Sequence, residues 1–249
     1  MSALLKPICI IPLLLFAVKI NAQQTNPYIK ATISDLLTQQ KHTGKKEFTF
    51  LPESTLTGKL FTINTNEKVN NVFKYDMVCY VIDGVGKFKT GNAVISLKTG
   101  SIVFVPRNSS YSFYDVEAPL HVYALLSLGS MADHGKSDNA GESFTLDQIE
   151  TQRSPGNNVW NSFLKRNSMI FGLYMLPKPL HGDSALTHKW DEVNLITKGT
   201  GKFQVGKSIM DVKPGDIVYV KKGNPHYFHS LNQNLDILIF FEMKSMEGE

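Results

Sequence analysis

An internal repeat constrains the fold of this chain more than any other feature of its sequence. Residues 76–113 align without a gap with residues 191–228, at an offset of 115 residues. The identical pairs include Asp76/Asp191, Gly84/Gly199, the run Gly86-Lys87-Phe88 with Gly201-Lys202-Phe203, Gly91/Gly206, Lys98/Lys213, Gly100/Gly215, Ile102-Val103 with Ile217-Val218, Val105/Val220 and Phe113/Phe228. Each copy holds several short apolar runs separated by glycines. A repeat of this length predicts two similar β domains rather than a solenoid of short units.

The repeat and its flanks divide the chain into five segments. Short β-rich runs fill residues 48–128 and 169–246, and we expect one β domain in each. Residues 23–47 contain apolar side chains at helical spacing between Tyr28 and Gln40, which predicts a short N-terminal helix. Residues 129–168 are polar and predict a linker, with a helix opening at the capping pair Thr145 and Gln148. Residues 1–22 are the fifth segment and contain a continuous apolar run.

The first 22 residues resemble a secretory signal peptide. A single basic residue, Lys6, precedes an apolar run from Ile8 to Val18, and Ala22 ends the segment. The run is shorter than the ~20 residues that a spanning helix needs, so no permanent membrane insertion is expected. We expect cleavage after Ala22 and export to the periplasm or beyond the cell. Removal of Cys9 would then leave Cys79 as the single cysteine, so no intrachain disulfide can form.

Charge and one false motif exclude two classes of function. The formal net charge is only +4, from 26 basic and 22 acidic residues, which gives no support for nucleic-acid binding. Residues 201–208 match the phosphate-binding loop expression. Such a loop must leave a strand and open a helix, whereas Lys202–Val205 alternates like a strand and Ser208 leads into another. Nucleotide binding is therefore not predicted.

The two copies differ in chemistry at three aligned positions. His188 aligns with Phe73, Glu192 with Met77, and His226 with Tyr111. The second copy thus carries two imidazoles and a carboxylate where the first carries apolar or aromatic groups. This pattern is expected if the second domain holds a ligand site and the first has filled the equivalent space with side chains.

The second copy resembles a cupin domain on these residues. Its first motif is His188, three residues, Glu192, six residues and Gly199, and its second runs from Gly215 through residues 216–225 to His226. Two departures are Leu186, where the family usually has a histidine, and Lys221, where it usually has proline. The resemblance implies an all-β bicupin of two tandem antiparallel jelly-roll barrels, the double-stranded β-helix. The N-terminal cupin is degenerate, with Asn71, Phe73, Met77 and Tyr111 at the ligand positions.

The three residues of the second copy predict a metal centre. Two His and one carboxylate suit Fe, Mn, Ni or Zn, and this set with open positions serves non-haem iron oxygenases. A buried histidine and glutamate can also hydrogen-bond to each other without a metal. Three ligand-type residues at motif spacing nevertheless favour one divalent metal ion. Possible fourth ligands are His181, Asp183 and His229. Strand parity suggests Asn194 and Phe228 as substrate-binding residues, and Trp190 and Tyr219 are further candidates. Core packing is the alternative role for the aromatic side chains.

The leading hypothesis is an exported bicupin that binds a divalent metal in its C-terminal barrel and acts on a small organic molecule. The chemistry would be that of a Lewis-acid isomerase or lyase, or of a non-haem iron dioxygenase. The alternative is a non-catalytic module that binds a sugar or another small ligand directly through His188 and Glu192. Two barrels in one chain can satisfy the pairing that single cupins obtain by dimerising, so a monomer is favoured over a dimer.

Overall fold

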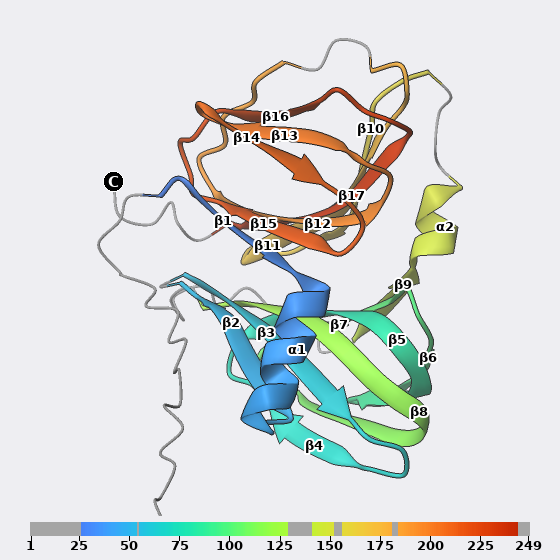
Figure 1. Cartoon of the computed structure of the whole chain (residues 1–249). Coiled ribbons are helices and arrows are strands. Elements are labelled where there is room, and N and C mark those ends of the chain that lie inside the picture. The colour runs from blue at the N-terminus through green and yellow to red at the C-terminus, as the bar shows by residue number, and fades with distance from the viewer. Residues whose placement is uncertain (1–25, 54, 129–140, 152–155, 181–183, 244–249) are drawn as a thin grey trace, which may run out of the picture.

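The computed structural model describes residues 26–53, 55–128, 141–151, 156–180 and 184–243, so the predicted signal peptide lies outside the described residues. Two β-barrels lie one above the other (Figure 1), and their strands pair antiparallel. The described residues include only two helices, α1 (Ile33–Thr43) and α2 (Leu146–Glu150). This confirms the predicted all-β class. Neither helix is long and apolar enough to cross a membrane.

The first barrel is built on one eight-stranded sheet in the order β2-β3-β8-β5-β7-β9, with β4 paired to β8 and β6 to β5. Its strands are β2 (Glu47–Pro52), β3 (Leu56–Ile63), β4 (Val69–Val72), β5 (Asp76–Thr90), β6 (Ala93–Leu97), β7 (Ser101–Val105), β8 (Ser110–Ser127) and β9 (Glu142–Thr145).

The second barrel combines a six-stranded sheet, β1-β15-β12-β17-β11-β10, with a three-stranded sheet, β14-β13-β16. Its strands are β1 (Tyr28–Thr32), β10 (Val159–Lys165), β11 (Met169–Leu176), β12 (Asp191–Lys198), β13 (Gly201–Val205), β14 (Ser208–Val212), β15 (Asp216–Val220), β16 (His226–His229) and β17 (Leu235–Glu242). Strand β10 thus joins this barrel, although the sequence placed residues 159–165 in the linker.

One position of the repeat requires glycine for the same structural reason in both barrels. Gly84 and Gly199 have φ of +98° and +85°. A Cβ atom at either position would lie 2.1 Å from a backbone oxygen, that of Pro119 or of Asn234. Only glycine fits this turn, so its repetition at an offset of 115 marks the same close approach of two strands.

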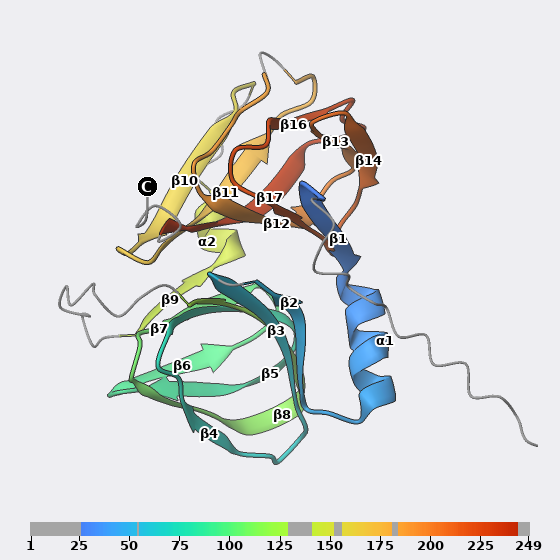
Figure 2. The same ribbon diagram turned by 90° about the vertical axis from the view of Figure 1, so that its left-hand side faces the viewer.

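The two barrels exchange strands. β1 precedes the first barrel in sequence but pairs with β15 of the second, whereas β9 precedes the second barrel but pairs with β7 of the first. Figure 2 shows β1 beside the upper barrel and α1 beside the lower one. Each exchanged strand leads into a helix whose first N–H donates to an equivalent carbonyl: Ile33 to Gly215 at 2.8 Å and Leu146 to Gly100 at 3.2 Å. The two halves of the chain are therefore related by pseudo-symmetry in the structure as well as by sequence.

This exchange corrects the predicted N-terminal helix. Residues Tyr28–Thr32, which the apolar spacing assigned to the helix, form β1 instead, and α1 begins at Ile33. The Thr32 hydroxyl accepts the N–H of Asp35 and caps the helix. The helix predicted from the capping pair does form, because the Thr145 hydroxyl accepts the Gln148 N–H while the Gln148 side chain accepts the Thr145 N–H.

One hydrophobic core is shared by the two barrels. Strand alternation sends Val193 and Leu195 of β12, and Ile217 and Tyr219 of β15, toward the first barrel, where they join residues such as Leu60. The interiors of the barrels form two further clusters, one in each. The sheets therefore pack face to face over a continuous apolar layer, which holds the barrels in one orientation.

Equivalent polar residues lie on either side of this interface. Asp76 accepts hydrogen bonds from the Arg107 backbone N–H at 2.8 Å, the Arg107 guanidinium at 2.9 Å and the Ser168 hydroxyl at 2.5 Å. Its counterpart Asp191 accepts one from the Lys222 N–H, the position equivalent to Arg107. Ser127 donates at 3.0 Å to Glu242, the residue 115 positions later, so equivalent residues meet across the pseudo-twofold axis.

Replacing Asp76 with Asn should weaken its interactions with Arg107 and Ser168. Burial opposes ionisation of Asp76, but the hydrogen bonds from Arg107 and Ser168 outweigh it and hold the pKa of the carboxyl below its usual value. The variant should lose about 3 kcal/mol of unfolding free energy at pH 7, measured by urea titration. Because a depressed carboxyl pKa stabilises only above that pKa, the deficit should shrink as the pH falls through it.

The exposed Asp147, which contacts Lys98 at 3.8 Å, supplies the control variant Asp147→Asn, whose stability should match the native protein. A pH-independent deficit in Asp76→Asn would contradict the ionic role of Asp76.

Aromatic rings fill the first barrel at the positions that carry ligand-type residues in the second. Phe73 and Tyr111 stack with ring centroids 5.6 Å apart, and Tyr111 stacks on Phe88 at 5.9 Å. Met77 is fully buried beside them. The residues aligned with His188, Glu192 and His226 thus form an apolar core in the first barrel.

Candidate metal centre and its cavity

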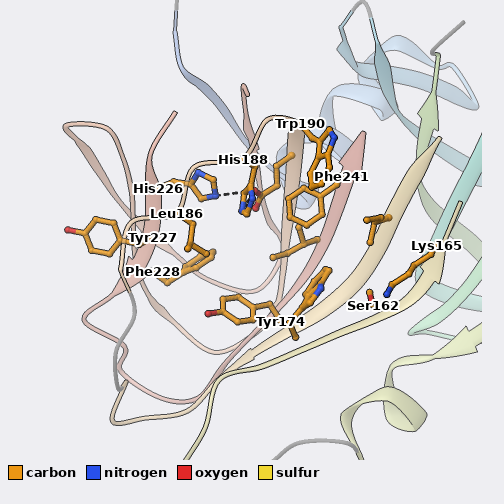
Figure 3. Close-up of a pocket in the computed structure, with 14 residues that line it drawn as sticks. Ser162, Lys165, Tyr174, Leu186, His188, Trp190, His226, Tyr227, Phe228 and Phe241 are labelled. Carbon is orange, nitrogen blue, oxygen red and sulfur yellow. Dashed lines mark ion pairs between the residues drawn. The ribbon is translucent and has the colours of Figure 1, made fainter. Parts of the chain in front are cut away.

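His188, Glu192 and His226 converge inside the second barrel. Figure 3 shows the rings of His188 and His226 side by side. Glu192 lies on β12 and His226 opens β16, while His188 lies in the segment before β12. Nε2 of His226 is 3.0 Å from Oε2 of Glu192, and Nε2 of His188 is 3.6 Å from the same oxygen. One ligand atom from each residue lies within 4.8 Å of the others. The three side chains therefore form a group that can hold a metal ion.

A backbone hydrogen bond sets the tautomer of His226. Its Nδ1 is 2.9 Å from the carbonyl oxygen of Asn224, which can only accept, so Nδ1 carries the proton. In the neutral ring Nε2 then presents a lone pair to Glu192, whose Oε2 is buried and accepts no hydrogen bond from a described residue. Ligand nitrogens and oxygens lie about 2.0–2.2 Å from a metal ion, so two of them on one ion lie roughly 3.0–3.4 Å apart. A cation between Nε2 and Oε2 would satisfy both atoms.

Burial favours the neutral form of the second imidazole. It lowers the pKa of His188, while the charge of Glu192 raises it and the neighbouring His226 lowers it further, so the net pKa lies below the usual value. Metals bind the neutral ring.

A cavity of about 460 Å³ opens beside these three residues. Its walls are mostly apolar and aromatic, and only Ser162, Lys165 and the three ligand-type residues add strongly polar groups. The lining residues are Trp160, Ser162, Lys165, Ile170, Tyr174, Leu186, His188, Trp190, Glu192, His226, Tyr227, Phe228, Ile239 and Phe241. Pockets of this size and character hold small organic molecules.

Aromatic packing shapes the wall next to the histidines. The Phe241 ring of β17 meets Trp160, Trp190 and His188 edge to face, at centroid distances of 5.9, 6.0 and 4.9 Å. Edge-to-face contacts of this kind hold rings in fixed orientations. Both tryptophans of the chain therefore line the cavity, so their fluorescence reports on it.

Gly172 of β11 makes room for the indole of Trp160. A Cβ atom at this position would lie 2.5 Å from Cη2 of Trp160 and 2.6 Å from the carbonyl oxygen of Asn161. The variant Gly172→Ala should lose about 1–3 kcal/mol of stability, because the strand and the indole must shift. It should also change the tryptophan emission spectrum. Metal affinity serves as the internal control and should be unchanged, whereas an unaltered emission spectrum would contradict the proposed packing.

The residues predicted to bind substrate lie in three different places. Trp190 and Phe228 line the cavity. Asn194 points into the same barrel as Glu192 but lies outside the cavity lining, fully buried, with its amide donating to the Val218 carbonyl at 3.4 Å. Tyr219 packs in the core shared with the first barrel, because Val218 and Val220 are the residues of β15 that face inward. Tyr219 is therefore removed from the candidate site.

None of the possible fourth ligands is placed with the group by the structure. His229 belongs to the same strand as His226, but its Nδ1 pairs with the hydroxyl of Ser230 at 2.9 Å and it is not part of the His–Glu group. Residues 181–183 lie outside the described part of the chain. Leu186 forms an isolated bridge with His226 and lines the cavity, so an apolar side chain occupies the position where a cupin usually has a histidine.

Sequence reasoning missed seven of the residues that line the cavity. Trp160, Ser162 and Lys165 come from β10, Ile170 and Tyr174 from β11, and Ile239 and Phe241 from β17. The alternation of Trp160 and Ser162 could have predicted a strand with these two side chains on one face. Assignment of both residues to the linker prevented that prediction.

Comparison with known proteins agrees with the fold and with the second-barrel motifs. Residues 174–239 match the cupin domain family. An uncharacterized protein of Streptomyces coelicolor is 33% identical over 100 residues, which are 40% of this chain and 94% of that protein.

Two solved structures have a similar fold over most of this chain. A cupin 2 conserved barrel domain protein from Leptotrichia buccalis has a TM-score of 0.63 at 16% identity and covers 79% of this chain and 88% of its own. Salicylate 1,2-dioxygenase from Pseudaminobacter salicylatoxidans has a TM-score of 0.71 at 9% identity, with coverage of 93% and 88%. At these identities the likeness shows the fold alone. Together, the family match and this likeness show that residues 174–239 form a cupin domain within a chain of cupin-like fold.

Proposed function

We propose that this protein binds one divalent metal ion through His188, Glu192 and His226 and acts on a small organic molecule held in the adjoining cavity. One observation carries the proposal: Oε2 of the buried Glu192 carboxylate lies 3.0 Å from Nε2 of His226, with the ligand atoms of all three residues within 4.8 Å of one another. An imidazole nitrogen and a carboxylate oxygen at this distance need a proton or a cation between them. Three ligand-type side chains around that point favour a metal.

The metal would supply Lewis acidity or a binding site for dioxygen. The chain's own residues hold and orient the reactants. His188 and His226 present imidazole nitrogens, and Leu186 offers no ligand atom, which leaves room for an oxygen of the substrate. The aromatic walls of Trp190 and Phe241 bind a flat, apolar body and exclude water from it. An aromatic substrate is also consistent with the structural similarity to a protein whose crystals include gentisate adducts.

Metal binding is the first test. Apo protein is titrated calorimetrically with Mn, Ni and Zn, and with Fe(II) under anaerobic conditions, and a stoichiometry of one is expected. Glu192→Gln and His226→Ala should bind no metal in the same range. His229→Ala is the matched control, because His229 lies on the same strand outside the group. Equal binding by all variants, or none by the native protein, would refute the proposal.

Reaction with dioxygen is the second test. Oxygen uptake by the Fe(II)-loaded protein is recorded with gentisate and with salicylate, and the Glu192→Gln variant gives the background. Uptake above that background assigns dioxygenase chemistry, and its absence with an intact metal site favours the Lewis-acid form of the proposal.

A non-catalytic ligand-binding module is the second candidate, because Leu186 removes a histidine that the family usually has. A chelator decides between the two candidates. Removing a bound metal lowers the melting temperature of the native protein. An unchanged melting temperature, together with ligand binding by the apo protein, would favour the module.

Export and a monomeric state belong to the same proposal. The order of Lys6, the apolar run from Ile8 to Val18 and Ala22 supports a cleaved leader. Mass spectrometry of the protein secreted by its host should give a chain that begins at Gln23. The strand exchange within one chain supports a monomer, which light scattering of the purified protein tests.

A further inference from the structure

We propose that Lys165 and Ser162 form a second anchor in the cavity, which binds a carboxylate at the end of the substrate remote from the metal. The substrate class is then an elongated apolar or aromatic carboxylate. The inference deepens the proposed function and rests on it for the location of the reacting end, but the anchor itself depends only on residues of β10.

A β-bulge turns Lys165 toward the cavity. Strand β10 pairs Asn161 with Leu173 and Leu164 with Phe171, so it advances three residues while β11 advances two. A regular strand would continue the alternation of Trp160 and Ser162 and point residue 164 into the cavity. The extra residue reverses this parity, as bulges do. Leu164 enters the core shared by the barrels, and Lys165 lines the cavity.

The ammonium of Lys165 has no acidic partner among the described residues. Its strand neighbour Arg166 differs, because it pairs with Glu142 and lies over the Phe104 ring, on the side of the first barrel. Glu192 is the single carboxylate in the cavity lining, and it belongs to the His–Glu group. The cavity therefore has one cationic side chain that is available to an anionic ligand, and the Ser162 hydroxyl beside it can donate a hydrogen bond.

The anchor and the His–Glu group lie at opposite sides of the cavity. Figure 3 shows Lys165 and Ser162 together on one side and His188 and His226 on the other. Apolar groups, including Trp160, Phe241 and Ile239, also line the cavity. Lys165 is exposed, so its ammonium stays hydrated and attracts a carboxylate without the cost of burying a charge. A molecule with an apolar body and a charged end matches this distribution.

The test uses 3-phenylpropionate and its uncharged amide, 3-phenylpropanamide, which have the same shape. Binding is followed by the fluorescence of Trp160 and Trp190, both in the cavity wall. The native protein should bind the carboxylate about fivefold more tightly than the amide, and the preference should weaken as salt is added. In Lys165→Met, which keeps an apolar stem, the two ligands should bind equally, with amide affinity unchanged. Lys207→Met, at an exposed lysine outside the cavity, should retain the preference.

Each titration is repeated on metal-free and zinc-loaded protein, and zinc affinity is measured separately for every variant. A preference lost in Lys165→Met in both forms supports the anchor, even if zinc does not bind and the proposed function fails. A preference that survives Lys165→Met but disappears without zinc would place the carboxylate on the metal and overturn the anchor. Equal binding of carboxylate and amide by the native protein, or binding of neither, would also overturn it.

Discussion

Saturating the metal-free protein with its divalent metal should raise the free energy of unfolding by about 2.7 kcal/mol when free metal exceeds Kd 100-fold. For a chain of this length that corresponds to an increase in melting temperature of roughly 5–10 °C. The gain arises because only the folded state brings His188, Glu192 and His226 within reach of one ion.

Replacing one of these residues should remove the gain. Loss of a residue that merely orients a metal ligand weakens binding about 10–100-fold, so loss of the Glu192 carboxylate should exceed 100-fold. At the same metal concentration the melting temperature of Glu192→Gln should then rise by less than about 2 °C. Differential scanning fluorimetry with and without metal measures both effects. His229→Ala should keep the full gain, and a full gain in Glu192→Gln would show that the ion binds elsewhere.

The variant Phe240→Ala should cost about 4 kcal/mol of unfolding free energy, the largest loss expected from a single side chain outside the metal centre. Phe240 is fully buried in the shared core and packs against Phe171 at a ring-centroid distance of 6.5 Å. Truncation leaves a cavity between two sheets that cannot close it, because each sheet is also fixed by its own barrel.

Because this core belongs to both barrels, the loss should appear in both together. Tryptophan fluorescence reports only on the second barrel, where Trp160 and Trp190 lie, whereas far-ultraviolet circular dichroism reports on both. In urea titrations the two signals should shift together to lower denaturant. Ile209→Ala, at a side chain 57% exposed on β14, is the control and should change stability by less than about 0.5 kcal/mol. Separate transitions would show that the barrels fold independently.

Much of the fold follows from patterns that are local in the chain. The duplication could be read directly from the glycines repeated at an offset of 115, of which Gly84 and Gly199 lie at a turn that tolerates no Cβ. His188 and Glu192 are four residues apart, and His226 follows a glycine turn within the same repeat. The contrast with Phe73 and Tyr111 indicated which barrel carries polar groups. The ligand-type residues and their short spacing could therefore be identified from the sequence without coordinates.

The sequence by itself determined two β-barrels and a group of His188, Glu192 and His226 in the second, since these depend on residue type and short spacing. Only the tertiary structure decided which barrel β1 and β9 join, that Tyr219 faces the partner barrel, and that Lys165 rather than Leu164 reaches the cavity. Strand pairing between distant segments is chosen by the packed state, and a single bulged residue reverses the facing of every side chain after it.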